Sequence, residues 1–409
     1  MNTLIQINTV ANSGSTGRIA EGIGNAAMTA GYSSHIAYGR YANSSSSKLI
    51  RIGQKKDYLL HGVRSRIFDD HGFGSVTATR KLLRQMDEIQ PDIVHLHNIH
   101  GYYLSYPLLF EYLKNKNLPV VWTLHDCWPF TGHCAYFDYA NCDKWKNGCY
   151  HCPQKKTYPA SYICDRSEQN WLDKKHYFTL PERMVIVPCS HWLGNLVKES
   201  FLGKYPVKVI HNGIDTSVFQ PHPEPGVRAK YGWEGQKILL GVASSWSSRK
   251  GLKDFIQLSG MLPDGYRIVL VGLNEKQMKD LPANITAFTR TESVQMLAEL
   301  YSTADVFLNL TWEDNYPTTN LEAISCGTPV ITYRTGGSPE SVTEETGLVV
   351  EQGDLQGVLD AVSSLRKDVA LCRKYALANF RQEDRFQDYI DLYGTLLNSC
   401  GKARQMQNN

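Results

Sequence analysis

Short apolar runs rich in β-branched residues alternate with longer stretches of helical periodicity along nearly the whole chain. In the first half these runs predict strands at Leu4–Thr9, His35–Gly39, Asp92–His97, Val120–Leu124 and Met184–Pro188. In the second half they predict strands at Lys208–His211, Ile238–Ala243, Arg267–Val271, Val306–Leu310, Val330–Tyr333 and Gly347–Val350. Strands separated by helices are typical of βα units with parallel sheets. The pattern therefore predicts an α/β protein.

The predicted strands are more than a single sheet usually contains, and the pattern restarts after about residue 200. We expect two doubly wound domains, 1–200 and 201–385, followed by a terminal helix and tail at 386–409. The division falls near residues 189–212, where Pro206 and the turn at Asn212 break the pattern. The stretch Val369–Leu397 reads as helix, and Gly401–Asn409 reads as a frayed tail.

The segment at about 127–170 fits this alternation badly and is interpreted as an insertion in the first domain. It holds six of the ten cysteines. One C-x-x-C pair with two nearby thiols could bind a structural zinc ion tetrahedrally, and the ligands would be Cys134, Cys142, Cys149 and Cys152. His133 and His151 are alternative ligands. The other interpretation is four ordinary reduced cysteines.

The composition excludes some classes of protein. The net charge is +3, and a nucleic-acid binder would usually carry a stronger basic stripe. The sequence has no apolar run near the ~18 residues of a membrane span, and its start reads as a strand rather than a signal peptide. We expect a cytoplasmic protein.

In the second half, the run at Val306–Leu310 is followed by a turn and a helix that Thr318 or Thr319 could cap. A helix start beside a strand end is a ready anion site. Glu322, about one turn into the helix, could accept two ribose hydroxyls, and Asp314 on the turn could hold sugar hydroxyls. The alternative is that these acidic residues only complement the helix dipole.

A second turn of this kind runs from Gly241 to Leu252 and includes Ser244. Here Lys250, together with Arg249, could neutralise a diphosphate leaving group. The alternative is a solvated basic pair on a loop.

Polar residues also follow predicted strands in the first half. Gly14, Ser15 and Gly17 lie where the first strand meets a helix and could bind substrate there, although a capped helix start explains these residues equally well. His97 and the His125-Asp126 pair end two later strands, and such positions reach a ligand cleft. His95 is interpreted as a hydrogen-bonded interior histidine.

Five blocks in the second half resemble family 4 glycosyltransferases over about residues 205–390. They are Val209–Asp215, the two turns described above, Cys326-Gly327-Thr328-Pro329-Val330 and Thr335–Glu340. The resemblance implies the GT-B fold, in which two facing Rossmann-like domains enclose a cleft. It also implies sugar transfer with retention of anomeric configuration and no metal cofactor in catalysis.

The resemblance further implies roles for particular residues. Glu322 would bind the ribose and Lys250 the diphosphate, while His125 and Asp126 would contact the donor sugar. The helix start would contact sugar or phosphate through Thr318, Thr319, Asn320 and Leu321. Two positions depart from the family pattern: Asp314 stands where the family has Glu, and Ser245 where it often has Arg.

The sequence thus predicts a glycosyltransferase that moves a sugar from a nucleotide-sugar donor to a saccharide or lipid-linked acceptor. The cysteine-bearing segment resembles that of capsule and exopolysaccharide enzymes, so polysaccharide biosynthesis is the expected setting. A lipid-linked acceptor would bring the protein to the inner face of the membrane. The alternatives are a nucleotide-sugar epimerase of the same fold and a non-catalytic sugar-nucleotide-binding assembly partner.

Overall fold

The computed structural model describes residues 1–222 and 226–407, with side chains as far as Asn398. It divides the chain into two compact units. The first unit is Met1–His211 together with the chain from Arg385 onward, and the second unit is Asn212–Asp384. The division lies between His211 and Asn212, within the range 189–212 that the sequence indicates and eleven residues beyond the expected domain bounds of 200 and 201.

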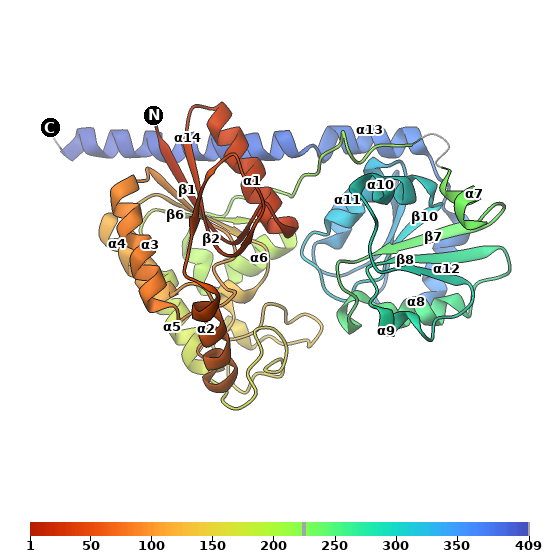
Figure 1. Cartoon of the computed structure of the whole chain (residues 1–409), viewed down its shortest axis with the longest axis horizontal. Helices are drawn as coiled ribbons and strands as arrows, with labels where there is room; N and C mark the ends of the chain where they lie inside the picture. Colours follow the sequence, from red (N-terminus) through yellow and green to blue (C-terminus); the bar gives the residue numbers. More distant parts are fainter. Residues whose placement is uncertain (223–225, 408–409) are drawn as a thin grey trace. The chain divides into compact units, whose positions relative to one another are not determined.

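The first unit is built on a six-stranded sheet in the order β3-β2-β1-β4-β5-β6, and all its strands are parallel (Figure 1). The strands are β1 Thr3–Ala11, β2 Ser33–Ala42, β3 Lys48–Arg51, β4 Ile93–Leu96, β5 Val120–Leu124 and β6 Met184–Pro188. The helices are α1 Gly14–Thr29, α2 Lys55–Phe68, α3 Val76–Ile89, α4 Tyr106–Lys116, α5 Ser167–Phe178, α6 His191–Glu199 and α14 Gln382–Gln407.

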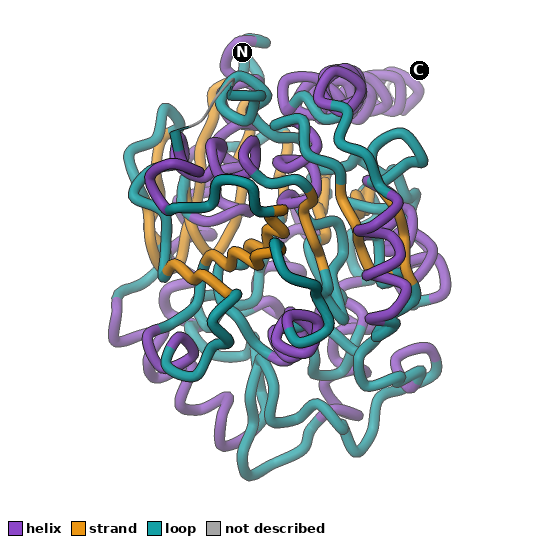
Figure 2. The backbone as a smooth tube through the Cα atoms, turned by 90° about the vertical axis from the view of Figure 1, so that its right-hand side faces the viewer, coloured by secondary structure: helices purple, strands orange, loops and turns teal. Residues whose placement is uncertain are grey.

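The second unit repeats this plan with a parallel sheet in the order β12-β11-β10-β7-β8-β9 (Figure 2). Its strands are β7 Lys237–Val242, β8 Tyr266–Val271, β9 Ile285–Phe288, β10 Val306–Asn309, β11 Val330–Tyr333 and β12 Gly347–Val350. Its helices are α7 Val227–Tyr231, α8 Leu252–Ser259, α9 Glu275–Met278, α10 Val294–Thr303, α11 Thr318–Ser325, α12 Leu355–Ser364 and α13 Val369–Asn379. The expectation of two doubly wound, Rossmann-like domains is therefore confirmed.

Each sheet has one point at which the strand order reverses. In the first unit it lies between β1 and β4, and in the second between β7 and β10. In open parallel sheets, ligands bind outside the carboxyl ends of the strands at this reversal. The topology therefore picks out the loops after four strands as candidate sites.

The central strands are buried on both faces, which explains their unbroken apolar runs. Ile93 and Val121 pack in the core of the first unit, and Leu239 and Leu308 in that of the second. Helix α14 adds Tyr393 to the first core.

Three details of the strand prediction need correction. Strands β3 and β9 are missing from the prediction. They lie at sheet edges and carry short, mixed sequences, so their apolar pattern is weak. The strand expected at Lys208–His211 is wrong. The segment does hydrogen-bond β6, through Lys208 N to Ile186 O at 3.0 Å and Ile210 N to Pro188 O at 3.2 Å, but it forms only an isolated bridge at Val207.

The carboxyl-terminal expectation changes as well. The helical stretch expected at Val369–Leu397 is two helices, α13 and α14, separated at Phe380 and Arg381. Helix α14 continues through Gly401 to Gln407, so the expected fraying does not begin at Gly401.

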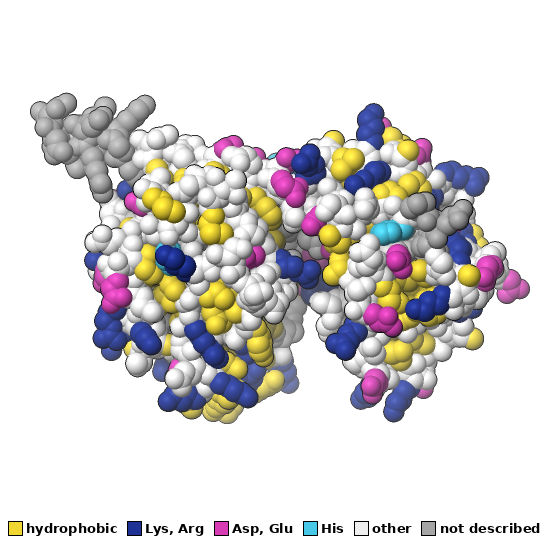
Figure 3. Space-filling view, turned by 45° about the horizontal axis from the view of Figure 1, so that its top comes forward, with side chains coloured by type: hydrophobic (Ala, Val, Ile, Leu, Met, Phe, Trp, Pro, Cys, Tyr) yellow, Lys and Arg dark blue, Asp and Glu magenta, His cyan; other side chains and the backbone are white. Residues whose placement is uncertain are grey.

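On the face drawn in Figure 3, Lys and Arg side chains are separated by acidic, polar and apolar surface, without a continuous basic stripe. No helix within the described residues combines the length and apolar character that crossing a membrane requires.

Candidate functional site

The loop that carries Lys250 is pressed against the end of β10. After β7, the chain forms a short 3-10 helix, Ser248–Lys250, and turns at Gly251 with φ +74°. A Cβ on Gly251 would lie 2.0 Å from the carbonyl oxygen of Leu310, so only glycine fits. The Trp312 N–H donates to the Arg249 carbonyl at 2.8 Å. Backbone contacts thus join the loops after β7 and β10, the two strands at the reversal.

An ion pair links the predicted side chains of these two loops. The Lys250 ammonium donates to Asp314 Oδ2, and the two side chains are 22% and 19% exposed. Arg249 donates through Nη1 to the carbonyl of Glu313. The structure therefore brings Arg249, Lys250 and Asp314 together. The Asp314 carboxylate partly neutralises the positive charge of Lys250.

The Thr335-Gly336-Gly337 block positions the loop that carries Asp314. Gly336 has φ +51°, and a Cβ there would lie 1.8 Å from the Asp314 carbonyl oxygen. Gly337 N donates to the same oxygen at 3.2 Å, and Thr335 Oγ1 donates to the Trp312 carbonyl at 3.0 Å. The sequence identified this block only through its resemblance, whereas its role here is to pack against the loop.

Helix α11 begins directly after this loop. Its N-cap is Pro317, with no side-chain cap, so the expected cap by Thr318 or Thr319 is wrong. Both threonines are half-buried in the first turn. Glu322 Oε2 accepts a 2.9 Å hydrogen bond from Tyr301. Burial and the neighbouring Glu322 raise the pKa of Tyr301 well above its usual value, so Tyr301 remains a donor that orients the carboxylate.

The remaining predicted residues of this unit are placed differently from one another. Asn320 and Leu321 are fully buried. Asn320 accepts from Asn309 at 2.7 Å and donates to the Ser338 and Ser341 hydroxyls at 3.1 and 3.0 Å. These side chains are engaged inside the protein. Ser244, in contrast, is exposed just beyond β7.

Sequence reasoning missed Asp254, which anchors the same region. Its Oδ2 accepts from Trp312 Nε1 at 2.7 Å and from the Tyr333 hydroxyl at 3.0 Å. Its position four residues after Lys250 in the chain was the only available signal.

In the first unit, the Gly14–Gly17 turn follows β1 at the reversal. Gly14 has φ +62°, and Ser15 is exposed. Gly17 is buried, where a Cβ would approach Val10 Cγ2 to 3.0 Å. The N-cap of α1, Ser13, forms no side-chain cap, and the first turn contains no acidic residue. The amide groups of this turn are thus available to an anion.

His97, after β4, and His125, after β5, meet at the same end of the sheet. His97 Nδ1 lies 3.3 Å from His125 Nε2, and His97 Nε2 lies 3.0 Å from Gln6 Oε1. Burial lowers the pKa of His125 to about 4 and that of His97 well below its ordinary value. Both rings are neutral at neutral pH and act as hydrogen-bonding groups.

Asp126 lies beside this pair and is ionised. Burial alone would raise its pKa, but His100, with Nε2 2.8 Å from Oδ2, and the Trp128 N–H, at 3.0 Å, together lower it. His100 Nδ1 also lies 2.8 Å from the Tyr158 hydroxyl. Tyr158 comes from the irregular insertion, and no local pattern could have placed it here.

His95 is an interior residue, as expected. Its ring nitrogens lie 2.6 Å from the Tyr393 hydroxyl and 2.8 Å from Thr123 Oγ1.

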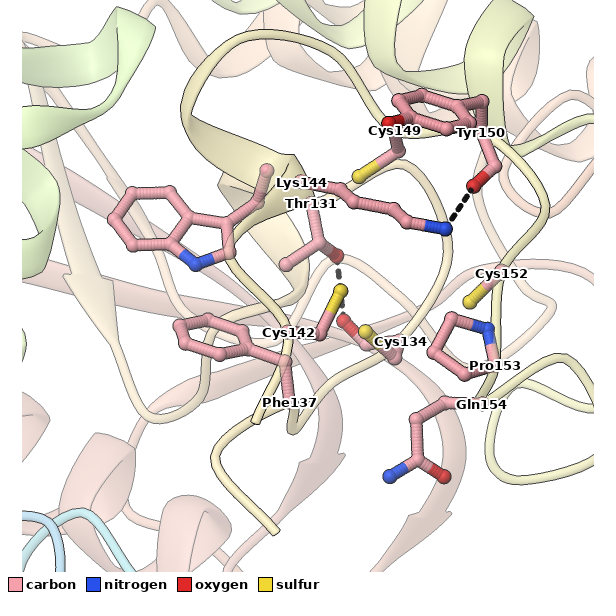
Figure 4. A pocket seen from close by; sticks show the side chains of 11 residues that line it. Thr131, Cys134, Phe137, Cys142, Lys144, Cys149, Tyr150, Cys152, Pro153 and Gln154 are labelled. Carbon is pink, nitrogen blue, oxygen red and sulfur yellow. Dashed lines mark hydrogen bonds between the residues drawn. The ribbon is translucent and has the colours of Figure 1, made fainter. Parts of the chain in front are cut away.

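The four predicted metal-ligand cysteines line one small cavity in the irregular segment (Figure 4). The cavity has a volume of about 10 Å³.

Comparisons with known proteins agree with this architecture. A model of the group 1 glycosyl transferases matches residues 236–368, and one of glycosyltransferase family 4 matches residues 17–218. The chain is 24% identical to the putative colanic acid biosynthesis glycosyl transferase WcaC of Escherichia coli K12, over 96% of this chain and 100% of that one.

Solved structures show the same fold. Sucrose-phosphate synthase of Thermosynechococcus elongatus superposes with a TM-score of 0.71 at 17% identity, covering 98% of this chain and 100% of that one. Anabaena HepE in complex with UDP-glucose gives 0.65 at 13% identity, covering 96% and 99%. The protein is therefore a glycosyltransferase with the two Rossmann-like domains of the GT-B fold. Its first part carries a glycosyltransferase family 4 domain, and its second part carries a group 1 glycosyl transferase domain.

Proposed function

We propose that this enzyme transfers a sugar from a nucleoside-diphosphate sugar to a saccharide or lipid-linked acceptor, with retention of anomeric configuration. One observation carries the proposal. The loops after β7 and β10, where the strand order of the second sheet reverses, carry Lys250, Arg249 and Asp314, and Glu322 lies in helix α11 directly after them.

The charges of these groups suit a diphosphate leaving group. A nucleoside diphosphate carries negative charge that grows as the glycosidic bond breaks, and preorganised cations and amides stabilise such charge most effectively. Lys250 and the first turn of α11 supply both. Glu322, which Tyr301 orients, suits the diol of the ribose.

Donor binding requires an exchange of partners at Lys250. The diphosphate would take the ammonium from Asp314, and the freed carboxylate could then accept hydroxyls of the transferred sugar. No general base is needed, since a departing phosphate oxygen can accept the proton of the attacking acceptor hydroxyl.

The neutral histidines of the first unit suit contacts with uncharged sugar hydroxyls. His125 and His97 can each donate or accept a hydrogen bond without adding charge, whereas Asp126 stays ionised. The Gly14–Gly17 turn, Ser15 and the uncapped start of α1 suit a donor phosphate or the acceptor.

WcaC is named for colanic acid biosynthesis and aligns over its whole length with this chain. This likeness supports polysaccharide biosynthesis as the setting. If the acceptor is carried on a lipid, the enzyme works at the inner face of the membrane.

The test is to incubate the purified chain with UDP-, GDP-, CDP- and ADP-sugars and saccharide acceptors, and to analyse the products by NMR. We expect acceptor-dependent transfer with the anomeric configuration of the donor. An inverted product would contradict retention, and an epimerised donor formed without acceptor would contradict transfer. Nucleotide binding without any turnover would favour a binding protein.

A further inference from the structure

The segment between η1 (Trp128–Phe130) and α5 is long and irregular. Apart from the single turn η2 (Lys144–Lys146), residues 131–166 form no helix or strand. Loops of this length without regular structure are uncommon in compact domains unless something holds them. This segment nevertheless delivers Tyr158 to His100, so its shape matters to the first unit.

The four cysteines of this segment lie around one small cavity. Cys134, Cys142, Cys149 and Cys152 line the same cavity, and Figure 4 shows their sulfur atoms gathered around it. Cys134 and Cys149 are buried, and the thiols of Cys134 and Cys152 share a hydrogen bond. The volume of about 10 Å³ corresponds to roughly one water-sized sphere, which also suits one metal ion.

The surroundings of the thiols match those of a thiolate-bound metal. Gly132 N–H donates to Cys149 Sγ at 3.1 Å. Such bonds to sulfur orient thiolate ligands and stabilise their charge. A Cβ on Gly132 would lie 2.0 Å from the Ser167 carbonyl oxygen and 2.6 Å from Cys149 Cβ, so the close approach requires glycine. The stacked rings of Phe137 and Trp145 cover the cavity with apolar surface.

A buried cation lies beside the cluster. Lys174 is only 1% exposed and donates to the carbonyls of Trp128 and Thr131 at 2.7 and 2.9 Å. Thr131 also lines the cavity, so its carbonyl ties the ammonium group to the cavity wall. Lysine is almost never fully buried unless it is paired. Four thiolates around Zn²⁺ carry net negative charge and would supply the counter-charge.

We propose that Cys134, Cys142, Cys149 and Cys152 bind one structural Zn²⁺ ion, which fixes the fold of the insertion. Zinc bound by four thiolates is closed to further ligands, so the ion takes no part in sugar transfer. Its binding energy supplements the small apolar core of the segment.

The first experiment measures the metal content of the full-length protein, purified without added metal, by plasma mass spectrometry. We expect about one zinc per chain. The metal is then replaced with Co²⁺, whose visible absorption reports tetrahedral geometry and whose sulfur-to-metal charge-transfer band scales with the number of thiolates. Less than about half an equivalent of zinc, together with no thiolate–cobalt spectrum, would overturn the proposal without any variant.

The variants assign the ligands. Cys142→Ser and Cys152→Ser should each lower the zinc content and the charge-transfer band. Cys164→Ser, in the same segment but away from the cavity, should retain both and is the matched control. Circular dichroism checks that the variants fold. Full zinc in Cys142→Ser with loss in His133→Gln would overturn the four-thiolate assignment.

Lys174→Met tests the role of the buried cation. It should weaken zinc binding about 10-fold, the lower end of the usual effect of outer-shell partners. An unchanged affinity would show that Lys174 does not compensate the charge of the cluster.

Discussion

The two units share one topology but place different chemistry at their strand reversals. In the first unit the polar groups are mostly neutral, buried histidines, and every histidine of the chain except His222 lies in that unit. In the second unit the corresponding loops carry the Lys250–Asp314 ion pair, and helix α11 after them carries Glu322. The two units share the place of the reversal but not its charge. Under the proposed function, the neutral groups of the first unit would contact uncharged sugar, and the cations of the second unit would bind the diphosphate.

The largest effect is expected at Lys250. Lys250→Ala should lower kcat by about 10²–10³-fold, the usual cost of removing one group that stabilises developing negative charge. Exposed Lys253, three residues further along, provides the control Lys253→Ala, for which we expect wild-type kinetics. Equal losses in the two variants, measured as initial transfer rates, would contradict a specific role for Lys250.

His125 should contribute less, because a neutral hydrogen bond stabilises less than a charged one. We expect His125→Ala to lower kcat/KM by roughly 10-fold, which corresponds to about 1.4 kcal/mol. Exposed His176 provides the control His176→Ala. With the wild-type enzyme, the rate should show no step near about pH 6.5, the ordinary histidine value. Such a step, if His125→Ala abolished it, would mean that His125 is charged during turnover.

Asp314→Asn should separate binding from transfer. Removing the carboxylate frees Lys250, so a nucleoside diphosphate without sugar should bind a few-fold more tightly, since partly exposed ion pairs are worth about 1 kcal/mol or less. Sugar transfer should fall, because the carboxylate is no longer present to hold sugar hydroxyls. Weaker diphosphate binding, measured by titration calorimetry, would show that Asp314 supports the phosphate site rather than competing with it.

The histidines should also make the first unit the more acid-sensitive of the two. Burial lowers the pKa of His61 to about 4 and that of His95 to about 3. Between these values and about 6.5, the unfolded chain binds protons that the folded unit does not, so stability falls as pH falls. Each such histidine lowers the free energy of unfolding by on the order of 1 kcal/mol when the pH falls from about 7 to 5.

Hydrogen exchange of backbone amides at about pH 7 and pH 5, corrected for intrinsic exchange rates, measures the stability of each unit separately. Protection should fall more in β4 and β5 than in β7 and β10. Equal losses in both sheets would contradict the assignment of acid sensitivity to the histidines.

Much of the fold followed from the sequence because buried parallel strands leave continuous apolar runs, as at Val120–Leu124 and Val330–Tyr333. The edge strands β3 and β9 could not be predicted, since edge strands tolerate mixed sequences. In the candidate site, the sequence placed Lys250 and Glu322 after predicted strands, and the family resemblance suggested their roles, which stay predictions. Asp254, Tyr158 and Tyr301 were not, because their contacts depend on packing between distant segments.

The most direct test is titration calorimetry of the four nucleoside diphosphates UDP, GDP, CDP and ADP against the wild type, Lys250→Ala and Lys253→Ala. The account predicts that at least one diphosphate binds the wild type and Lys253→Ala alike, and that Lys250→Ala binds it at least about 10-fold more weakly. Equal affinity in all three proteins would contradict the assignment of the diphosphate to the second unit's reversal.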